Sequence, residues 1–212
     1  MRALIIVSAR FNPQELWGCL KTLKNHEITF DVYSLENPIR NEKTGDRFNI
    51  TGLVADIDMK RLNKYDGLYI ISGAFLETKD YWWHDKTRRI VEWFNEKEKM
   101  LAAICCATPT IRYAAEGKKV SYYHMIDTED LLGGFYAILT DASLTVDGNL
   151  VTAEHQQVTV QWTEAGIAIM KGEEYKSFIK EEVSNASNVK TPLIRKKKWA
   201  DARFPDKDVT KE

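Results

Sequence analysis

Short, continuous apolar runs alternate with segments of helical periodicity along most of the chain. The apolar or β-rich runs cover 3–9, 29–35, 67–73 and 100–104. Apolar positions at helical spacing cover 13–26, 79–97, 109–115 and 158–170. Continuous apolar runs are typical of strands buried on both faces, and their alternation with helices is typical of βαβ units. The pattern therefore predicts an α/β fold, with a mostly parallel central sheet and helices on both of its faces.

Two hairpins are expected to interrupt this alternation. The polar stretch 36–52 predicts a turn or an excursion hairpin. Farther along, Asp147-Gly148 is a hairpin turn signal between β-like runs at 142–146 and 149–153.

The composition changes near residue 172, so we interpret 1–171 as one α/β domain and 172–212 as an extension. An amphipathic helix is expected over 173–183, and the rest is polar and lacks periodicity. Its basic run beside Trp199 is typical of a solvated tail, and the alternative is an arm that docks on a partner subunit.

Charge and cysteine usage narrow the class of protein. Thirty Lys and Arg against 31 Asp and Glu leave a net charge of −1, which argues against a dedicated nucleic-acid-binding protein. No apolar run approaches the ~20 residues that span a bilayer, and Arg10 ends the first run too early for a signal peptide. Three Cys, two of them adjacent, are not a disulfide framework. We therefore expect a cytoplasmic protein that contacts neither nucleic acid nor membrane.

The adjacent pair Cys105-Cys106 follows the apolar run 100–104 and precedes a predicted helix. Thr108 is a candidate N-cap and Pro109 a favourable first helical residue. The free amides and positive dipole end of a helix lower a thiol pKa from about 8.5 into the ~3.5–7.5 range of reactive thiols. The pattern predicts an activated thiolate at Cys105 on a nucleophile elbow. The alternative is that both cysteines are small core residues.

Four segments resemble the ThiJ/PfpI superfamily, which includes the Parkinsonism-associated deglycase and the PfpI-type intracellular proteases. AAICCATPT at 102–110 resembles the cysteine signature AAICHGP or AAICAGP of that family. RALIIVSARFNPQEL at 2–16 resembles its first strand and loop, and LNKYDGLYIISGA at 62–74 resembles its YDALVLPGG strand. TVDGNLVT at 145–152 resembles VVVDGNLVTS. The segments follow the family order, and the resemblance covers residues 1 to about 171.

The resemblance implies a flavodoxin-like α/β sandwich that is usually a homodimer. It also implies that Glu15 is protonated and donates a hydrogen bond to the Cys105 thiolate, a role that suits a carboxyl group held neutral beside an anion. Gly73 and Ala74 would supply backbone N–H groups to an oxyanion or substrate carbonyl, and Cys106 would complete this substrate-binding position. The plainer alternatives are an exposed carboxylate in a first helical turn and a strand that ends in small residues.

The chain departs from the family pattern around the cysteine. Cys106 stands where the hydrolytic branches commonly have a His, which removes the simplest Cys–His pair. Ser72 stands where Pro is usual and Ala74 where a second Gly is usual, so the oxyanion loop is expected to differ.

Two histidines are candidates to complete the site. The His of the deglycase branch corresponds to Tyr123 or His124, and the register between them stays open. His155 follows the run 149–153, where loops return to the same end of the sheet. A loop exposed to solvent is the alternative position for both His124 and His155.

These residues favour a cysteine-dependent enzyme acting on a small molecule. Cys105 would attack the electrophilic carbon of a 2-oxoaldehyde, amide or nitrile-like group, while Glu15 tunes the thiol. Peptide cleavage is disfavoured, because it needs a base and an acid for the leaving group. The alternatives are a redox sensor that oxidises the same thiol and an inactive member that binds partners. Since GxGxxG and zinc-type Cys/His spacings are missing, we expect no cofactor and no metal.

Overall fold

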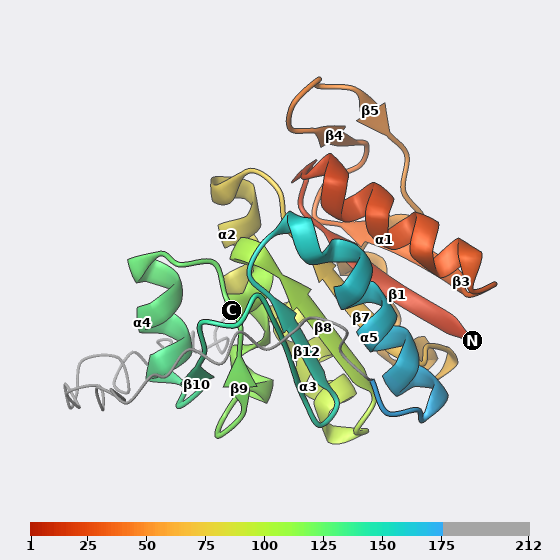
Figure 1. The fold of residues 1–212 in the computed structure, drawn as a ribbon. Coiled ribbons are helices and arrows are strands. Elements are labelled where there is room, and N and C mark those ends of the chain that lie inside the picture. The colour runs from red at the N-terminus through yellow and green to blue at the C-terminus, as the bar shows by residue number, and fades with distance from the viewer. Residues whose placement is uncertain (176–212) are drawn as a thin grey trace, which may run out of the picture. The chain divides into compact units, whose positions relative to one another are not determined.

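The computed structural model describes residues 1–175, which are built around a seven-stranded sheet (Figure 1). Its strands are β1 (Arg2–Val7), β3 (Thr29–Ser34), β6 (Gly52–Leu53), β7 (Gly67–Ile71), β8 (Met100–Ile104), β11 (Leu144–Asp147) and β12 (Leu150–Ala153). They lie in the order β11-β12-β8-β7-β1-β3-β6, and only β11 runs antiparallel to its neighbour. The predicted α/β class with a mostly parallel sheet is confirmed.

Helices connect these strands. The α-helices of the described residues are α1 (Pro13–Asn25), α2 (Phe75–Trp83), α3 (Asp85–Glu96), α4 (Ile126–Gly134) and α5 (Thr159–Lys171). The 3-10 helices are η1 (Val54–Asp56), η2 (Met59–Lys64), η3 (Cys105–Ala114) and η4 (Gln156–Val158). A short parallel pair of strands, β9 (Lys119–Val120) and β10 (Ile138–Leu139), flanks α4.

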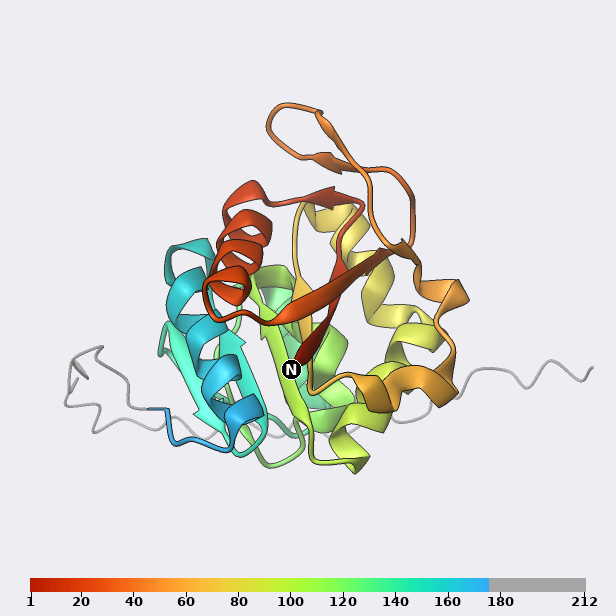
Figure 2. The same cartoon turned by 90° about the vertical axis from the view of Figure 1, so that its right-hand side faces the viewer.

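Side chains of β1 alternate between two separate cores. Ala3, Ile5 and Val7 belong to the core beneath α1 and α5, and Leu4 and Ile6 belong to the core beneath α2, α3 and η3. Figure 2 shows the sheet between these two layers of helices. All five side chains are fully buried, which explains why the run is continuously apolar rather than alternating.

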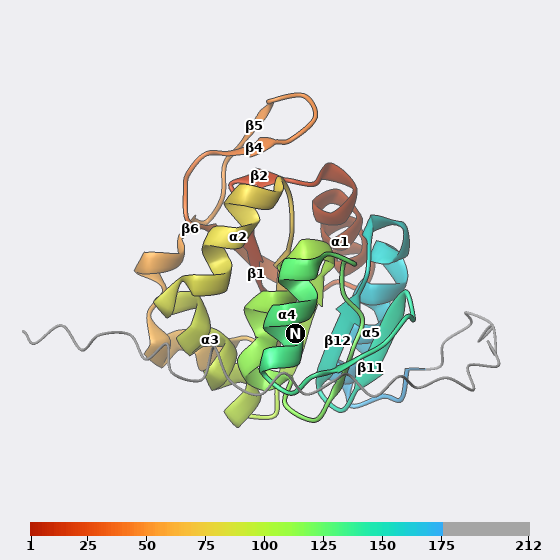
Figure 3. The same ribbon diagram turned by 90° about the vertical axis from the view of Figure 1, so that its left-hand side faces the viewer.

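The excursion expected in 36–52 contains a hairpin of β4 (Ile39–Asn41) and β5 (Arg47–Phe48). β4 also pairs in parallel with β2 (Arg10–Phe11). Figure 3 shows that this hairpin projects beyond the end of the sheet. Edge-to-face aromatic contacts attach it to α1, because the ring of Trp17 lies 5.3 Å from that of Phe11 and 4.9 Å from that of Phe48.

Residues 79–97 do not form the single helix that their apolar spacing predicts. The backbone of His84 is extended and separates α2 from α3. Its Nδ1 accepts a hydrogen bond from the N–H of Thr87 at 3.3 Å, so His84 is the N-cap of α3. Both segments bury apolar residues on the same core, which is why the periodicity continues across the break.

The C-terminal end of the described chain follows α5, where Gly172 adopts a left-handed backbone with φ of +72° and caps the helix. The helix expected over 173–183 and the basic segment beside Trp199 lie outside residues 1–175, so the boundary between domain and extension stays a prediction. Within 1–175, no helix is long and apolar enough to cross a membrane.

Candidate active site

A sharp turn at Cys105 joins β8 to η3. Cys105 has a φ of +56°, a left-handed backbone that costs a residue other than glycine roughly 1–2 kcal/mol. The helix begins at this residue and not at the predicted Thr108-Pro109. Instead of capping the helix, the Thr108 hydroxyl donates to the Cys105 carbonyl at 2.9 Å, and Pro109 lies inside η3. The strained position of Cys105 is the geometry expected of a nucleophile elbow.

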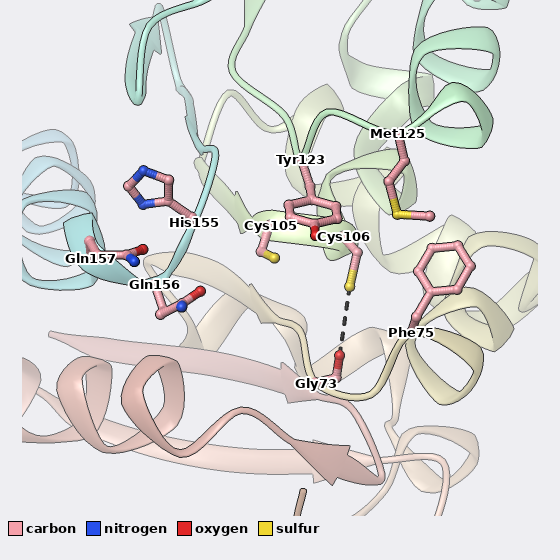
Figure 4. Close-up of a pocket in the computed structure, with 9 residues that line it drawn as sticks. All are labelled: Gly73, Phe75, Cys105, Cys106, Tyr123, Met125, His155, Gln156 and Gln157. Atoms are coloured by element: carbon pink, nitrogen blue, oxygen red, sulfur yellow. Dashed lines mark hydrogen bonds between the residues drawn. The ribbon is translucent and has the colours of Figure 1, made fainter. Parts of the chain in front are cut away.

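Both cysteines line a pocket of about 560 Å³ (Figure 4). Its lining residues are Gly73, Phe75, Cys105, Cys106, Tyr123, Met125, His155, Gln156 and Gln157. They come from the segments after β7, β8 and β12, which end at the same edge of the seven-stranded sheet, and from the segment after β9 of the separate two-stranded pair. This agrees with the rule that ligands bind beyond the carboxyl ends of parallel strands.

The two adjacent thiols influence each other's acidity. Cys105 lowers the pKa of Cys106 to about 7, although burial acts in the opposite direction. The neighbouring Cys106, burial and the nearby Glu15 carboxyl raise the pKa of Cys105. The sequence predicts a lowered pKa at Cys105, whereas within the pair the lowering falls on Cys106. Because the two thiols interact, they titrate as a pair.

Glu15 lies in the first turn of α1 and is completely buried. Burial raises the pKa of Glu15 to about 8, even though the hydroxyl and backbone N–H of Ser72 hydrogen-bond to its carboxyl group at 2.7–2.9 Å. The carboxyl is therefore neutral near pH 7, as the resemblance implies. Its hydrogen bonds go to Ser72, however, and Ser72 in turn lowers the pKa of both thiols.

The amides of Gly73 and Ala74 do not point to an open oxyanion position. The Gly73 N–H donates to the Thr78 hydroxyl at 3.0 Å, and the Ala74 N–H donates to the Arg10 carbonyl at 2.7 Å. Gly73 itself is required by this close approach, because a Cβ there would lie 1.8 Å from the Arg10 carbonyl oxygen. The Gly73 carbonyl group faces the pocket instead, and its oxygen lies 3.7 Å from the Cys106 Sγ (Figure 4).

The structure distinguishes between Tyr123 and His124. Tyr123 lines the pocket, and Figure 4 shows its hydroxyl directed toward the two cysteines. The His124 ring is not part of the lining and packs against Tyr122, with Glu129 and Glu154 at 3.9 Å and 3.8 Å from its ring nitrogens. Of the two residues, Tyr123 and not His124 therefore faces the thiols.

His155 lies at the edge of the pocket, directly after β12. In Figure 4 its ring extends away from the thiols, and its Nε2 lies 3.7 Å from the Glu154 carboxylate. Its Nδ1 is buried without a hydrogen-bond partner among residues 1–175. His155 therefore needs a change of rotamer before it can exchange a proton with either cysteine.

Several pocket residues carry no sequence signal that marks them as functional. Phe75 and Met125 form an apolar wall beside Cys106, and Gln156 and Gln157 lie on the opposite side (Figure 4). Behind the elbow, the buried Trp82 donates its indole N–H to the Cys106 carbonyl at 2.8 Å. This hydrogen bond holds the cysteine turn against α2.

Comparison with known proteins decides the family. The model of the DJ-1/PfpI family matches residues 1–168. The chain belongs to the DJ-1/PfpI family. An uncharacterized protein of Methanocaldococcus jannaschii is 25% identical over 154 residues, which are 71% of this chain and 73% of that protein.

Solved structures of the DJ-1/PfpI family share the fold. A ThiJ/PfpI domain protein from Brachyspira murdochii superimposes with a TM-score of 0.72 at 19% identity, over 82% of this chain and 98% of that one. Schizosaccharomyces pombe DJ-1 has a TM-score of 0.69 at 15% identity, over 83% of this chain and 93% of that one. The predicted flavodoxin-like sandwich and the resemblance to the ThiJ/PfpI superfamily are thereby confirmed.

Proposed function

We propose that this member of the DJ-1/PfpI family is a cysteine-dependent enzyme acting on a small carbonyl or amide-like compound. The observation that carries the proposal is the adjacent pair Cys105 and Cys106 on a left-handed elbow, with both residues lining a pocket of about 560 Å³. A nucleophile next to a base of near-neutral pKa is the arrangement that covalent catalysis requires.

Cys105 is the nucleophile and Cys106 the base in this mechanism. Cys105 is the more exposed of the two and occupies the elbow, whereas Cys106 is buried and carries the lower pKa. When the Cys105 sulfur attacks a carbonyl carbon, its proton passes to the neighbouring Cys106 thiolate. Cys106 thus acts as the base in place of the histidine that follows the nucleophile in other branches of the family.

The negative charge on the carbonyl oxygen has two sources of stabilisation. The first amides of a 3-10 helix lack intrahelical acceptors, and in η3 these include Cys106 and Ala107. The amide after the nucleophile is the usual oxyanion donor on an elbow. The Tyr123 hydroxyl, directed at the same place, supplies an O–H donor. Gly73 and Ala74 are not needed for this role.

For a 2-oxoaldehyde, the thiol adds across the aldehyde C=O to form a hemithioacetal. A proton then moves from C1 to C2, which turns C1 into a thioester and C2 into an alcohol. Water cleaves the thioester, restoring the thiol and releasing a 2-hydroxy acid, so the net reaction is the addition of one water without an external oxidant or reductant. For an amide, the thiol sulfur adds to the carbonyl carbon, the C–N bond breaks and the amine leaves with the thiol proton. Water then cleaves the resulting acyl thioester to a carboxylic acid and the free thiol.

The deciding experiment measures turnover of methylglyoxal and of a panel of small amides. Cys105→Ser is expected to abolish turnover, and Cys106→Ser to lower kcat by about 100-fold or more, the usual effect of losing a general base. Cys19→Ala is the matched control, since Cys19 is fully buried, is not among the pocket-lining residues, and burial raises its pKa to about 12.

The redox alternative makes a different prediction from the same thiols. If wild-type protein turns over neither substrate class while peroxide selectively oxidises Cys105 or Cys106, the enzyme proposal is wrong and a redox-sensing role replaces it. An inert pair would favour the third hypothesis, a partner-binding member. The homodimer and the cytoplasmic location remain predictions, and sedimentation and cell fractionation would test them.

A further inference from the structure

The adjacent thiols offer a binding chemistry that is separate from catalysis. We propose that Cys105 and Cys106 form a chelating site for a monosubstituted trivalent arsenic compound, with the organic substituent against the apolar wall of Phe75 and Met125. Both sulfurs and both apolar side chains line one pocket, so a single small ligand can contact all four. The proposal does not depend on the proposed enzymatic activity.

The position of the sulfurs favours a bridging atom over a direct bond. Adjacent Cα atoms are about 3.8 Å apart, below the ~4.4–6.8 Å that disulfides usually span. A bridging atom makes the ring one atom larger and relieves this strain. Arsenic(III) is pyramidal and binds two sulfurs at a narrow angle, which suits two thiols on adjacent residues that line the same pocket. A centre that prefers two opposed sulfurs, such as Cu(I), fits this pair poorly.

The position of the cysteines on the helix also favours this ligand. Soft centres bind thiolates. Both cysteines stand at the start of η3, where the first amides and the positive end of the helix dipole stabilise an anion. The two thiols belong to adjacent residues, so the second As–S bond forms within one molecule.

The pocket selects for a substituent. Phe75 and Met125 present an aromatic ring and a thioether beside Cys106, and Tyr123 covers the thiols (Figure 4). No lining residue is Asp, Glu, Lys or Arg, so the lining favours a neutral ligand. A neutral arylarsenic(III) compound satisfies both requirements, because the aryl group packs on the apolar wall while arsenic binds the sulfurs.

Binding is a condensation and not a redox step. An arsine oxide, R–As=O, reacts with two thiols to give R–As(S)₂ and one water. Two S–H bonds and the As=O bond break, two As–S bonds form, and both thiol protons leave with the oxygen. Arsenic stays trivalent, so no oxidant or reductant is required.

The test is titration of the full-length protein with phenylarsine oxide, followed by intact mass spectrometry and by counting of free thiols. We expect one adduct that consumes two thiols, survives excess monothiol and is released by a dithiol. Either Cys105→Ser or Cys106→Ser is expected to weaken binding by about 100-fold, the loss typical of a broken chelate. Cys19→Ala should leave the affinity unchanged.

A second variant keeps the test decisive if a cysteine variant fails to fold. Phe75→Ala is expected to weaken the binding of phenylarsine oxide severalfold. The binding of arsenite, which has no aryl group, should be unaffected. An adduct that a monothiol strips from the wild-type protein would overturn the chelate. Failure to turn over aldehydes or amides would leave this result standing, because the titration measures binding alone.

Discussion

At the scale of single residues, the site depends on one buried hydroxyl. Ser72 hydrogen-bonds to Glu15 and lowers the pKa of both Cys105 and Cys106. A proline, usual at this position in the family, has neither a hydroxyl nor an N–H and would make none of these hydrogen bonds. The departure from the family pattern at residue 72 therefore adds a polar link between the carboxyl and the thiols.

Replacing Glu15 with Gln is expected to change how stability depends on pH. The ordinary pKa of the carboxyl is 4.5 and its folded value is about 8, so between these values the unfolded chain loses the proton and the folded chain keeps it. The Glu15 contribution to the free energy of unfolding is therefore fully present below pH 4.5 and falls as pH rises toward 8, by up to ~1.4 kcal/mol per pH unit. Because glutamine does not ionise, Glu15→Gln removes this pH-dependent contribution to the free energy of unfolding.

Urea unfolding of both proteins at pH 5, 6, 7 and 8 measures the difference. Glu15→Gln should gain stability relative to wild type at each step upward, and the gain should level off above pH 8. Parallel curves for the two proteins across this range would show that Glu15 ionises normally in the folded state.

At the scale of elements, the sequence was most informative where strands are buried. The runs 67–73 and 100–104 contain β7 and β8, because fully buried parallel strands admit few polar residues. The 3-10 helices η1 and η2 have no 3.6-residue period, so the apolar spacing predicts no helix there. For the same reason the sequence predicts the start of η3 at Thr108-Pro109, three residues after its start at Cys105.

The candidate site was predictable to the same extent. Cys105, Cys106 and Glu15 follow from strand ends and a family resemblance, and the structure gathers them at one end of the sheet. The choice between Tyr123 and His124 depends on the chain direction after the two-residue strand β9, which no periodicity fixes. The position of the two thiols depends on the left-handed turn at Cys105. The backbone preferences of cysteine do not predict this conformation.

The break between α2 and α3 leads to a prediction at His84. Its Nδ1 caps α3, and burial lowers the pKa of His84. His84→Ala should cost about 1 kcal/mol in free energy of unfolding at pH 7.5, whereas His84→Asn, which retains a capping oxygen, should cost much less.

Lowering the pH should reduce the stabilisation that His84 provides as the N-cap of α3. Because the folded state favours neutral His84, its contribution is present above the ordinary pKa of 6.5 and is lost as pH falls below it. Urea unfolding at pH 7.5 and 5.5 should show that His84→Asn becomes more stable relative to wild type at the lower pH. If the difference in free energy of unfolding between the two proteins were the same at both pH values, His84 would not titrate as the cap.

At the scale of the whole molecule, the site exists only when distant segments assemble. Glu15 belongs to α1, Ser72 follows β7, the cysteines follow β8 and Tyr123 follows β9. The groups that lower the pKa of Cys106 are Cys105, Thr78, Ser72 and Gly73, so this pKa reports on the packing of β7, α2 and β8 against one another. Local helix formation alone would not produce it.

A substitution at Tyr81, which lies outside the pocket, can test how the site depends on the folded structure around it. Its buried hydroxyl donates to the Val7 carbonyl at 2.7 Å, accepts from the Leu35 N–H at 2.9 Å and lies 2.8 Å from the Ser34 hydroxyl, joining α2 to β1 and β3. Tyr81→Phe leaves these buried groups without their partner, which costs about 1–3 kcal/mol in free energy of unfolding. The pKa of Cys106 in the folded protein should not change, because Tyr81 is not among the groups that set it.

Two measurements on the same samples separate stability from site chemistry. Circular dichroism in urea should show a lower midpoint for Tyr81→Phe. Alkylation of the cysteine pair by iodoacetamide should lose the pH dependence expected of a lowered pKa at that same midpoint. In the absence of urea, the pH profile of alkylation should match wild type. If the pH dependence were lost well before the helices unfolded, the elbow would open as a separate unit, and the lowered pKa would not report on the packing of the surrounding elements.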